Sequence, residues 1–131
     1  MKKINAVLVI DDDHIYCFLI RRVIQKSGIT DRVIFAKDGL DAIKKMSEFS
    51  PKENICPELI LVDVEMPVMD GIEFVESFYK LDFVNKAQVK LVINSFTINP
   101  LIALKLKLLN INQYIQKPLS EHKLREIVTV Y

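Results

Sequence analysis

The sequence lacks several features that would point to other kinds of protein. Its only two cysteines, Cys17 and Cys56, form neither a CxxC pair nor a disulfide framework, so we expect buried free thiols in a reducing compartment. No apolar run approaches the roughly 20 residues that cross a bilayer. We also expect no signal peptide, because the apolar run near the start ends at Asp11. We therefore expect a cytoplasmic protein.

The chain also has almost no net charge. Its 18 basic and 17 acidic residues leave a formal charge of +1. This balance gives no general electrostatic reason to expect binding to nucleic acid or to an anionic membrane. Hydrophobic residues make up 50% of the 131 residues, which is enough for a sizeable core. A chain of this length fits one domain, and we expect residues 1–131 to form it.

Strand-like and helix-like segments alternate five times along the chain. Continuous apolar runs predict strands at Ala6–Ile10, Arg32–Ala36, Leu59–Val62, Val89–Ile93 and Tyr114–Ile115. Apolar residues at helical spacing predict helices at Ile15–Lys26, Gly39–Phe49, Gly71–Leu81, Leu101–Leu109 and Ser120–Val130. This alternation, with short connections, predicts an α/β fold with a doubly wound parallel sheet of five strands and helices on both faces.

Three details of the helices are also predicted. In the first helix, the residues at helical spacing are Ile15, Phe18, Leu19 and Val23. Pro51 is expected to break the second helix, because proline lacks the N–H group that a helix interior needs. Ser120 is expected to cap the last helix.

Polar side chains follow four of the five predicted strands. Asp11–Asp13 follow the first strand, Asp63 ends the third, Ser95 follows the fourth and Lys117 follows the fifth. In a parallel sheet the carboxyl ends of the strands share one edge, and ligands bind there at the point where the strand order reverses. The sequence therefore predicts a site made by these residues.

The acidic part of this site calls for a cation. Carboxylates gathered without a counter-ion would raise one another's pKa and destabilise the fold. Carboxylate oxygens are hard ligands and no His or Cys cluster offers a zinc site, so Mg²⁺ fits best. We expect Asp11 and Asp12 to bind it, with Asp63 completing the site. Asp13 is better explained as the cap of the first helix.

The remaining groups suit phosphoryl chemistry. A carboxylate placed like Asp63 can attack a phosphoryl group and form an acyl phosphate. The ammonium of Lys117 would neutralise the developing charge, and the hydroxyl of Ser95 would bind a phosphoryl oxygen. Asn94 and Thr97 remain alternatives to Ser95.

Four segments, in order, resemble the signature segments of one family: VLVIDDDH, LILVDVEMPVMDGIEF, LVINSFTINP and YIQKPLS. They resemble the receiver domains of bacterial two-component response regulators, and the D-x-x-M-P-x-M-D-G pattern at Asp63–Gly71 is highly specific. The resemblance runs from about Val7 to the last helix. It implies a flavodoxin-like sheet with strand order 2-1-3-4-5 and a stand-alone receiver in residues 1–131, without an output domain.

The resemblance also implies a role for each site residue. Asp63 would accept a phosphoryl group from a histidine kinase or a histidine phosphotransfer protein, and Lys117 would pair with it. Ser95 and Tyr114 would be switch residues, and the Lys117-Pro118 bond would be cis. Such a protein signals and turns over no free metabolite. The implied ligands of Mg²⁺ are Asp11, Asp12, Asp63 and the backbone carbonyl of Glu65.

Two features depart from the family or add to it. Phe96 follows Ser95 where the family usually has a small residue, so either the ring slows phosphate exchange or Asn94 or Thr97 lies nearer the site. In the fourth helix, apolar residues that include Ile102 and Leu106 cover an arc of about 200°, more than a core-facing stripe needs. The surplus indicates a docking face for a partner or a second copy, formed with the fifth strand and fifth helix, unless the helix is deeply buried.

Two other classes of protein remain open. Asp11-x-Asp13 followed by His14-Ile15 faintly resembles the start of the haloacid-dehalogenase group, which would make the chain a Mg²⁺-dependent phosphohydrolase with Asp11 as nucleophile. That hypothesis leaves the Asp63–Gly71 pattern unexplained. The other is a degenerate receiver that acts only as a binding module.

Overall fold

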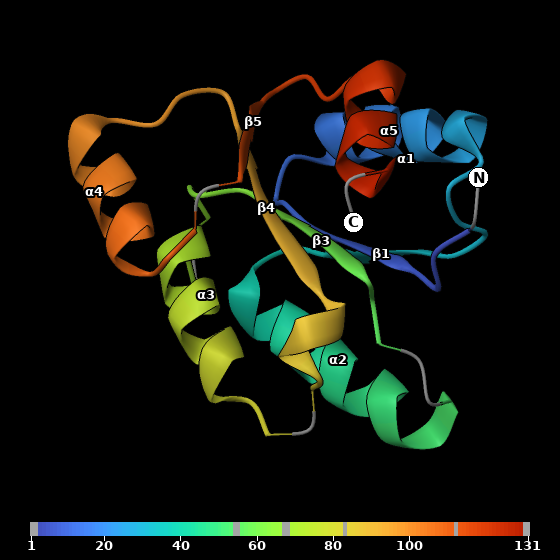
Figure 1. Ribbon diagram of the computed structural model, residues 1–131, viewed down its shortest axis with the longest axis horizontal. Coiled ribbons are helices and arrows are strands. Elements are labelled where there is room, and N and C mark those ends of the chain that lie inside the picture. Colours follow the sequence, from blue (N-terminus) through green and yellow to red (C-terminus); the bar gives the residue numbers. More distant parts are fainter. Residues whose placement is uncertain (1–2, 54–55, 67–68, 83, 112, 130–131) are drawn as a thin grey trace.

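A five-stranded parallel sheet forms the centre of the protein (Figure 1). The computed structural model describes residues 3–53, 56–66, 69–82, 84–111 and 113–129. The strands are β1 (Val7–Ile10), β2 (Val33–Ala36), β3 (Leu59–Val62), β4 (Lys90–Ser95) and β5 (Tyr114–Gln116). Their spatial order is β2-β1-β3-β4-β5, and every neighbouring pair is parallel. The predicted fold class and strand order are confirmed.

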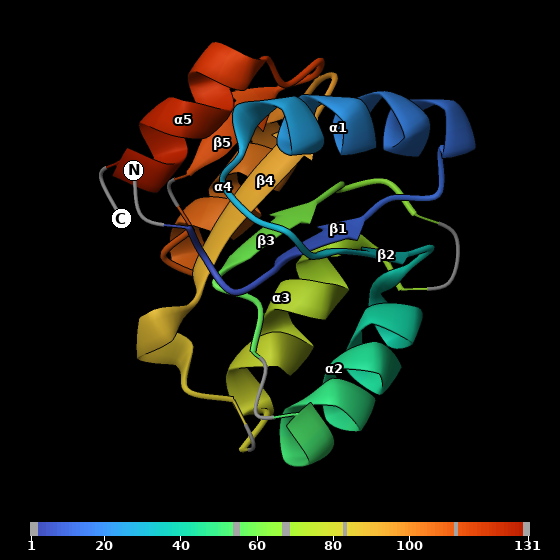
Figure 2. The same cartoon turned by 90° about the vertical axis from the view of Figure 1, so that its right-hand side faces the viewer.

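Helices cover both faces of this sheet. They are α1 (His14–Ser27), α2 (Gly39–Glu53), α3 (Gly71–Lys80), α4 (Pro100–Leu108) and α5 (Glu121–Thr129), with a short 3₁₀ helix η1 (Lys86–Gln88) before β4. Figures 1 and 2 show α1 and α5 together on one face of the sheet and α2 and α3 on the other. Helix α4 lies next to α3, at the left of Figure 1. Among the described residues, no helix is long and apolar enough to cross a membrane.

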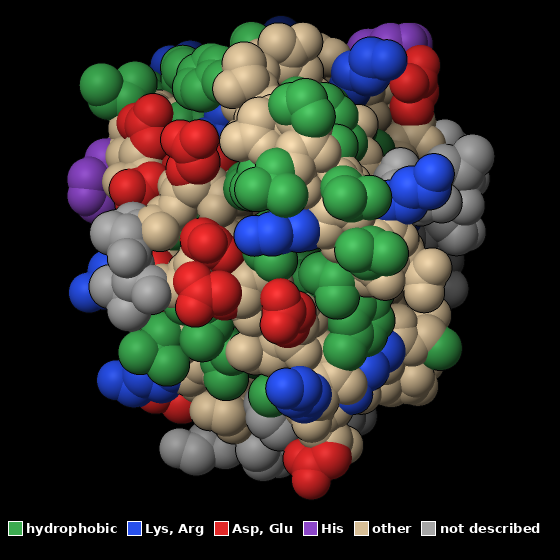
Figure 3. Space-filling view, turned by 90° about the vertical axis from the view of Figure 1, so that its left-hand side faces the viewer, with side chains coloured by type: hydrophobic (Ala, Val, Ile, Leu, Met, Phe, Trp, Pro, Cys, Tyr) green, Lys and Arg blue, Asp and Glu red, His purple; other side chains and the backbone are tan. Residues whose placement is uncertain are grey.

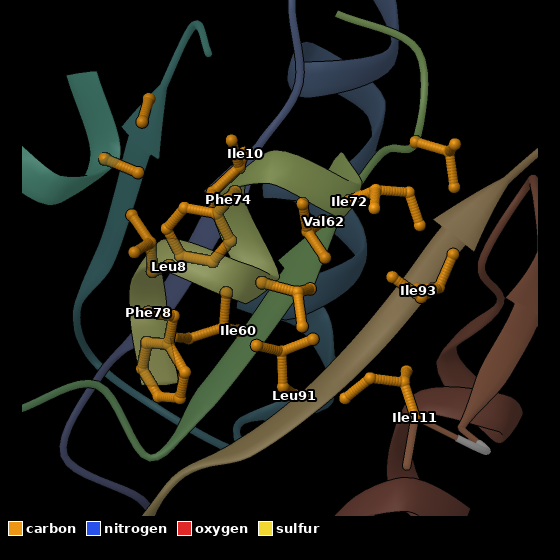
Figure 4. Packing of buried hydrophobic residues seen from close by; sticks show 14 of the residues in the cluster. Leu8, Ile10, Ile60, Val62, Ile72, Phe74, Phe78, Leu91, Ile93 and Ile111 are labelled. Carbon is orange, nitrogen blue, oxygen red and sulfur yellow. The ribbon is translucent and has the colours of Figure 1, made fainter. Parts of the chain in front are cut away.

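The strands are apolar on both faces because each face packs against helices. In β1, Leu8 and Ile10 point into the core shared with α2, α3 and α4, whereas Val7 and Val9 point into the core shared with α1 and α5. β3 alternates in the same way. Figure 4 shows the first core, where Phe74 and Phe78 of α3 lie against β1 and β3. The two cores hold the strand ends in fixed positions.

The buried face of α1 is not the one that carries most of the apolar residues at helical spacing. Of the apolar residues whose helical spacing predicted this helix, Ile15, Phe18 and Leu19 are 75%, 60% and 50% exposed, and Val23 packs against the core. The buried residues are Tyr16, Ile20, Ile24 and Ser27. The helix is apolar along two arcs, and the spacing of apolar residues alone does not decide which arc meets the sheet.

The ends of three helices follow local rules. Gly28, with φ +72°, ends α1 in the left-handed conformation that glycine adopts without strain. The prediction that Pro51 breaks α2 is wrong, because the helix continues to Glu53. Proline's fixed φ of about −65° is itself a helical value, so the helix can continue through Pro51 although it loses one backbone hydrogen bond and the ring crowds the preceding turn. Ser120 caps α5 as predicted: its Oγ accepts a hydrogen bond from the backbone N–H of Lys123 at 3.1 Å.

Both cysteines are free, but they are half-buried rather than fully buried as expected. Burial, together with the negative charges of Asp11 and Asp13, raises the pKa of the Cys17 thiol to about 11. Burial also raises the pKa of Cys56. At neutral pH both side chains are therefore protonated thiols of low reactivity.

Candidate functional site

Four buried polar side chains meet at the carboxyl edge of the sheet. Asp11 follows β1, Asp63 follows β3, Ser95 ends β4 and Lys117 follows β5. Their exposed fractions are 5%, 8%, 4% and 5%. β1 and β3 are neighbours in the sheet, and the strand order reverses between them, which is where ligands bind in open α/β sheets. The structure thus brings together all four polar positions that follow strands in the sequence.

Lys117 lies between the two buried carboxylates. Its Nζ is 2.6 Å from Asp11 Oδ2 and donates a hydrogen bond to Asp63 Oδ2 at 3.2 Å. Ser95 Oγ donates to the other oxygen of Asp63, Oδ1, at 3.0 Å. The carboxylate of Asp63 is therefore held by an ammonium group on one oxygen and by a hydroxyl group on the other.

Burial and neighbouring charges change the pKa values of two groups in the site. Burial raises the pKa of Asp11 above its ordinary value, even though the ammonium of Lys117 and the backbone N–H of Asp13 act in the opposite direction. For Lys117, burial lowers the pKa, but the carboxylates of Asp11 and Asp63 more than offset it, so the pKa is raised. Lys117 is therefore fully charged at neutral pH and supplies one positive charge to two acidic groups.

Asp12 adds a third carboxylate, which is exposed to solvent. Ligand oxygens of Asp11, Asp12 and Asp63 all lie within 4.8 Å of one another. The backbone N–H of Asp13 donates to Asp11 Oδ1 at 2.9 Å and fixes the orientation of that carboxylate. Three hard oxygen donors this close together suit Mg²⁺, which takes carboxylates and keeps several waters.

Asp13 itself has a different role. Its Oδ1 accepts hydrogen bonds from the backbone N–H groups of Ile15 and Tyr16 at 3.0 and 3.2 Å. Asp13 is therefore the N-cap of α1, as the sequence predicted. Because its carboxylate is engaged by the helix, an Asp11-x-Asp13 catalytic pair of the dehalogenase kind is not favoured.

A hollow of about 650 Å³ opens above these groups. Figure 3 shows the face that carries α4, where acidic side chains gather beside a run of hydrophobic ones. Glu65 lines the hollow, and its backbone N–H lies 3.4 Å from Asp63 Oδ1. The use of the Glu65 carbonyl as a metal ligand stays a prediction. The other lining residues include Asp12, Asp63, Met66, Asp70, Ser95, Phe96, Thr97 and Lys117.

Phe96 lies at the mouth of this hollow. Its side chain is 57% exposed, and its ring centroid is 5.2 Å from Lys117 Nζ. Of the three candidates for the hydroxyl position, only Ser95 has a hydrogen bond to Asp63 among the described residues. Asn94 is engaged elsewhere, since its Nδ2 donates to the carbonyl of Ile115 at 2.9 Å. Ser95 therefore supplies the hydroxyl of the site even though the bulky side chain of Phe96 follows it and lines the same hollow.

Two further features follow the resemblance. The Lys117-Pro118 peptide bond is cis, as implied. Tyr114 is 42% exposed, and its hydroxyl lies 3.4 Å from the backbone carbonyl of Ser95. The aromatic residue is thus linked to the strand end that carries the hydroxyl of the site.

Gly71 allows α3 to approach the backbone of Asp63. A Cβ atom at this position would lie 2.4 Å from the carbonyl oxygen of Asp63 and 2.8 Å from Val64 Cα. The backbone N–H of Gly71 donates to the carbonyl of Val64 at 2.9 Å. The Asp-Gly pair of the sequence pattern therefore has two physical roles: Asp70 caps α3, and Gly71 permits the close contact. Pro67 and Val68, from the same pattern, lie outside the described residues.

Comparison with known proteins agrees with this geometry. The response regulator receiver domain family matches residues 7–129, and the chain belongs to this family of phosphoacceptor signalling domains. The chemotaxis protein CheY of Treponema pallidum is 31% identical over 122 residues, which cover 92% of this chain and 77% of that protein. The receiver class was therefore correctly predicted from the sequence.

A second relative is much longer than the chain. A protein-glutamate methylesterase/protein-glutamine glutaminase of Thermotoga maritima is 33% identical over 78 residues, which cover 60% of this chain but only 21% of that protein. Among solved structures, a two-component response regulator from Cytophaga hutchinsonii has a TM-score of 0.86 and 26% identity, covering 98% of this chain and 97% of that one. The shared part is thus the receiver fold.

Proposed function

We propose that Asp63 is the residue that accepts the phosphoryl group. The observation that carries this proposal is the pair of contacts on its carboxylate, Lys117 Nζ at 3.2 Å and Ser95 Oγ at 3.0 Å. A nucleophilic carboxylate needs positive charge and hydrogen-bond donors where negative charge develops on the transferring group. Both kinds of donor already point at the oxygens of Asp63.

In this reaction an oxygen of Asp63 attacks the phosphorus atom of the donor, and the bond from phosphorus to the leaving nitrogen or oxygen breaks. Lys117 stabilises the charge on the phosphoryl oxygens, because its ammonium is buried and stays protonated. Ser95 then transfers its hydrogen bond from Asp63 to a phosphoryl oxygen. The donor is a phosphohistidine of a histidine kinase or of a phosphotransfer protein, and no free metabolite is turned over.

We propose Asp11, Asp12, Asp63 and the backbone carbonyl of Glu65 as the Mg²⁺ ligands. Bound Mg²⁺ would neutralise negative charge on the phosphoryl oxygens during transfer. The proposal is supported by the three carboxylates within 4.8 Å and by their hard oxygen chemistry. Asp11 also binds Lys117, so the ammonium and the metal would share this carboxylate.

Phosphorylation would become a signal through β4, α4 and β5. Movement of Ser95 toward the phosphoryl group would disturb the contact between its carbonyl and the hydroxyl of Tyr114. The docking face proposed here includes three exposed leucines of α4: Leu101, Leu104 and Leu108, which are 61%, 53% and 75% exposed. Leu106 was wrongly assigned to this face, because it is 4% exposed and belongs to the core.

The proposal is tested by incubating the protein with acetyl phosphate and Mg²⁺ and measuring its intact mass. We expect one added phosphoryl group in the wild-type protein and none in Asp63→Asn. Asp13→Asn is the matched control, since asparagine caps helices as well as aspartate does and should leave labelling intact. Labelling that survives in Asp63→Asn would contradict the proposal. Wild-type protein that is folded and stays unlabelled would instead support the degenerate receiver.

A further inference from the structure

A buried polar pair lies beside Lys117 and is not used by the proposed chemistry. Tyr16 of α1 and Asn94 of β4 are 5% and 2% exposed. The hydroxyl of Tyr16 donates a hydrogen bond to Oδ1 of Asn94. Their surroundings are the apolar core between the sheet, α1 and α5, which includes Val9, Ile20, Val92 and Leu124. A polar pair in such a place requires a reason, because apolar side chains of similar size would fill it without needing partners.

The remaining hydrogen-bonding groups of the pair are bound to backbone atoms. Asn94 Nδ2 donates to the carbonyl of Ile115 at 2.9 Å, and the hydroxyl oxygen of Tyr16 accepts from the backbone N–H of Leu119 at 3.3 Å. The pair therefore joins α1, β4, β5 and the segment that follows the Lys117-Pro118 bond. A satisfied buried network of this kind fixes one arrangement of the segments that it joins.

Two residues of the site lie on or next to these segments: Ser95 ends β4, and Lys117 lies between β5 and Leu119. Asn94 directly precedes Ser95, whose hydroxyl binds Asp63. Ile115 and Leu119 lie two residues before and two residues after Lys117, so both sides of the lysine are tied to the pair. In addition, Lys117 Nζ lies 4.4 Å from the ring centroid of Tyr16, which places the ammonium against the aromatic ring.

We propose that Tyr16 and Asn94 are positioning residues for phosphoryl transfer. Together they keep the ammonium of Lys117 and the hydroxyl of Ser95 within hydrogen-bonding distance of the carboxylate of Asp63. This inference rests on the proposed role of Asp63. Tyr16 acts on Lys117 in two ways, through its ring and through the hydrogen bond to Leu119. Asn94 acts on Ser95 through the strand that they share and on Lys117 through Ile115.

The kinetic test uses Tyr16→Phe, which keeps the ring and removes only the hydroxyl. With saturating Mg²⁺ and a series of acetyl phosphate concentrations, we expect the maximal rate of Asp63 phosphorylation to fall about tenfold, because small displacements of positioned groups slow transfer strongly. The half-saturating donor concentration should change less than twofold, since the pair does not touch the hollow. Asn94→Leu should reproduce this pattern, and the double variant should be little slower than either single variant.

The matched control is Ser27→Ala in the last turn of the same helix. Ser27 is also buried, at 4% exposure, and its hydroxyl donates to the carbonyl of Ile24 at 2.6 Å. This variant loses a buried hydrogen bond far from Lys117, so it should be destabilised while keeping the wild-type maximal rate. If Tyr16→Phe and Asn94→Leu both kept a maximal rate within twofold of wild type, as Ser27→Ala should, the positioning role would be overturned.

A second measurement is independent of phosphorylation. In the unphosphorylated protein, the nitrogen chemical shift of the Lys117 ammonium group reports its immediate surroundings. We expect this signal to move in Tyr16→Phe and Asn94→Leu and to stay in place in Ser27→Ala. An unchanged signal in both site variants would contradict the proposal, even if Asp63 were phosphorylated normally. Conversely, a wild-type protein that is never labelled at Asp63 would contradict the proposed function. The chemical shift of the Lys117 ammonium group would still show whether Tyr16 and Asn94 position Lys117.

Discussion

Lys117 is the residue on which the charge balance of the site depends. Its ammonium contacts Asp11 and Asp63 at 2.6 and 3.2 Å, and the side chain of Lys117 is only 2% exposed. Buried ion pairs add little stability relative to apolar groups, but removal of one partner leaves an uncompensated buried charge. The site is therefore arranged for chemistry rather than for stability.

Replacement of Lys117 by methionine tests this charge balance. We expect Lys117→Met to lower the free energy of unfolding by about 3–5 kcal/mol in the absence of Mg²⁺, because two carboxylates lose their shared ammonium. Added Mg²⁺ should restore part of the loss. Urea unfolding measures both effects. Lys3→Met is the control, since its ion pair with Asp31 is exposed and should contribute at most about 1 kcal/mol. Equal losses in the two variants would contradict this account.

Tyr16 predicts how stability depends on alkaline pH. Burial, followed by the negative charge of Asp11, raises the pKa of Tyr16 from 10.0 to about 12, although hydrogen bonds partly oppose it. The folded state therefore holds this proton more tightly than the unfolded state, and the associated stability is present below pH 10 and lost as pH rises toward 12. The free energy of unfolding should fall less steeply over this range in Tyr16→Phe than in wild type. Parallel curves would show that Tyr16 does not titrate in this way.

At the scale of elements, α3 and the strand end at Asp63 form one rigid unit. A methyl group at position 71 would meet the carbonyl oxygen of Asp63, which is backbone and cannot rotate away. We expect Gly71→Ala to destabilise the protein and to slow phosphorylation of Asp63 by acetyl phosphate. Gly28→Ala is the control: it strains a left-handed position but meets no atom within 4 Å, so it should cost stability without changing phosphorylation. A fully active Gly71→Ala variant would argue against this unit.

The exposed face of α1 suggests where the phosphodonor protein docks. Ile15, Phe18 and Leu19 are exposed apolar residues on the helix that starts beside Asp11–Asp13. Our hypothesis is that Phe18→Asp slows phosphoryl transfer from a cognate histidine phosphotransfer protein at least tenfold and leaves the reaction with acetyl phosphate unchanged. Leu104→Asp on α4 is the control and should preserve both rates. Unchanged protein-to-protein transfer in Phe18→Asp would reject the hypothesis.

At the scale of the whole molecule, the sequence was sufficient for the architecture and for the gathering of the site. Strand β1 is apolar at every position because both of its faces are covered, and the charged residues begin where it ends. Once the strands are parallel, their carboxyl ends must share an edge, so Asp11, Asp63, Ser95 and Lys117 converge whatever the details of packing.

Other features depend on three-dimensional packing that no local pattern records. The side of α1 that is buried is one such feature, because the exposed Ile15, Phe18 and Leu19 are as apolar as the residues that face the sheet. The contact between Tyr16 and Asn94 joins positions 78 residues apart, and a tyrosine in an amphipathic helix carries no signal of it. The continuation of α2 past Pro51 was missed because the lost hydrogen bond and the crowded preceding turn disfavour a helix locally but do not forbid it.

The proposed roles of Lys117, Ser95 and the acidic residues all depend on Asp63 being the carboxylate that accepts the phosphoryl group. The position of the phosphoryl group tests this most directly. Wild-type protein is phosphorylated with acetyl phosphate and Mg²⁺, digested, and mapped by tandem mass spectrometry. The account predicts that the modified peptide carries the label on Asp63, which Lys117 and Ser95 contact. A label on Asp11, as in a phosphohydrolase of the dehalogenase kind, would contradict it.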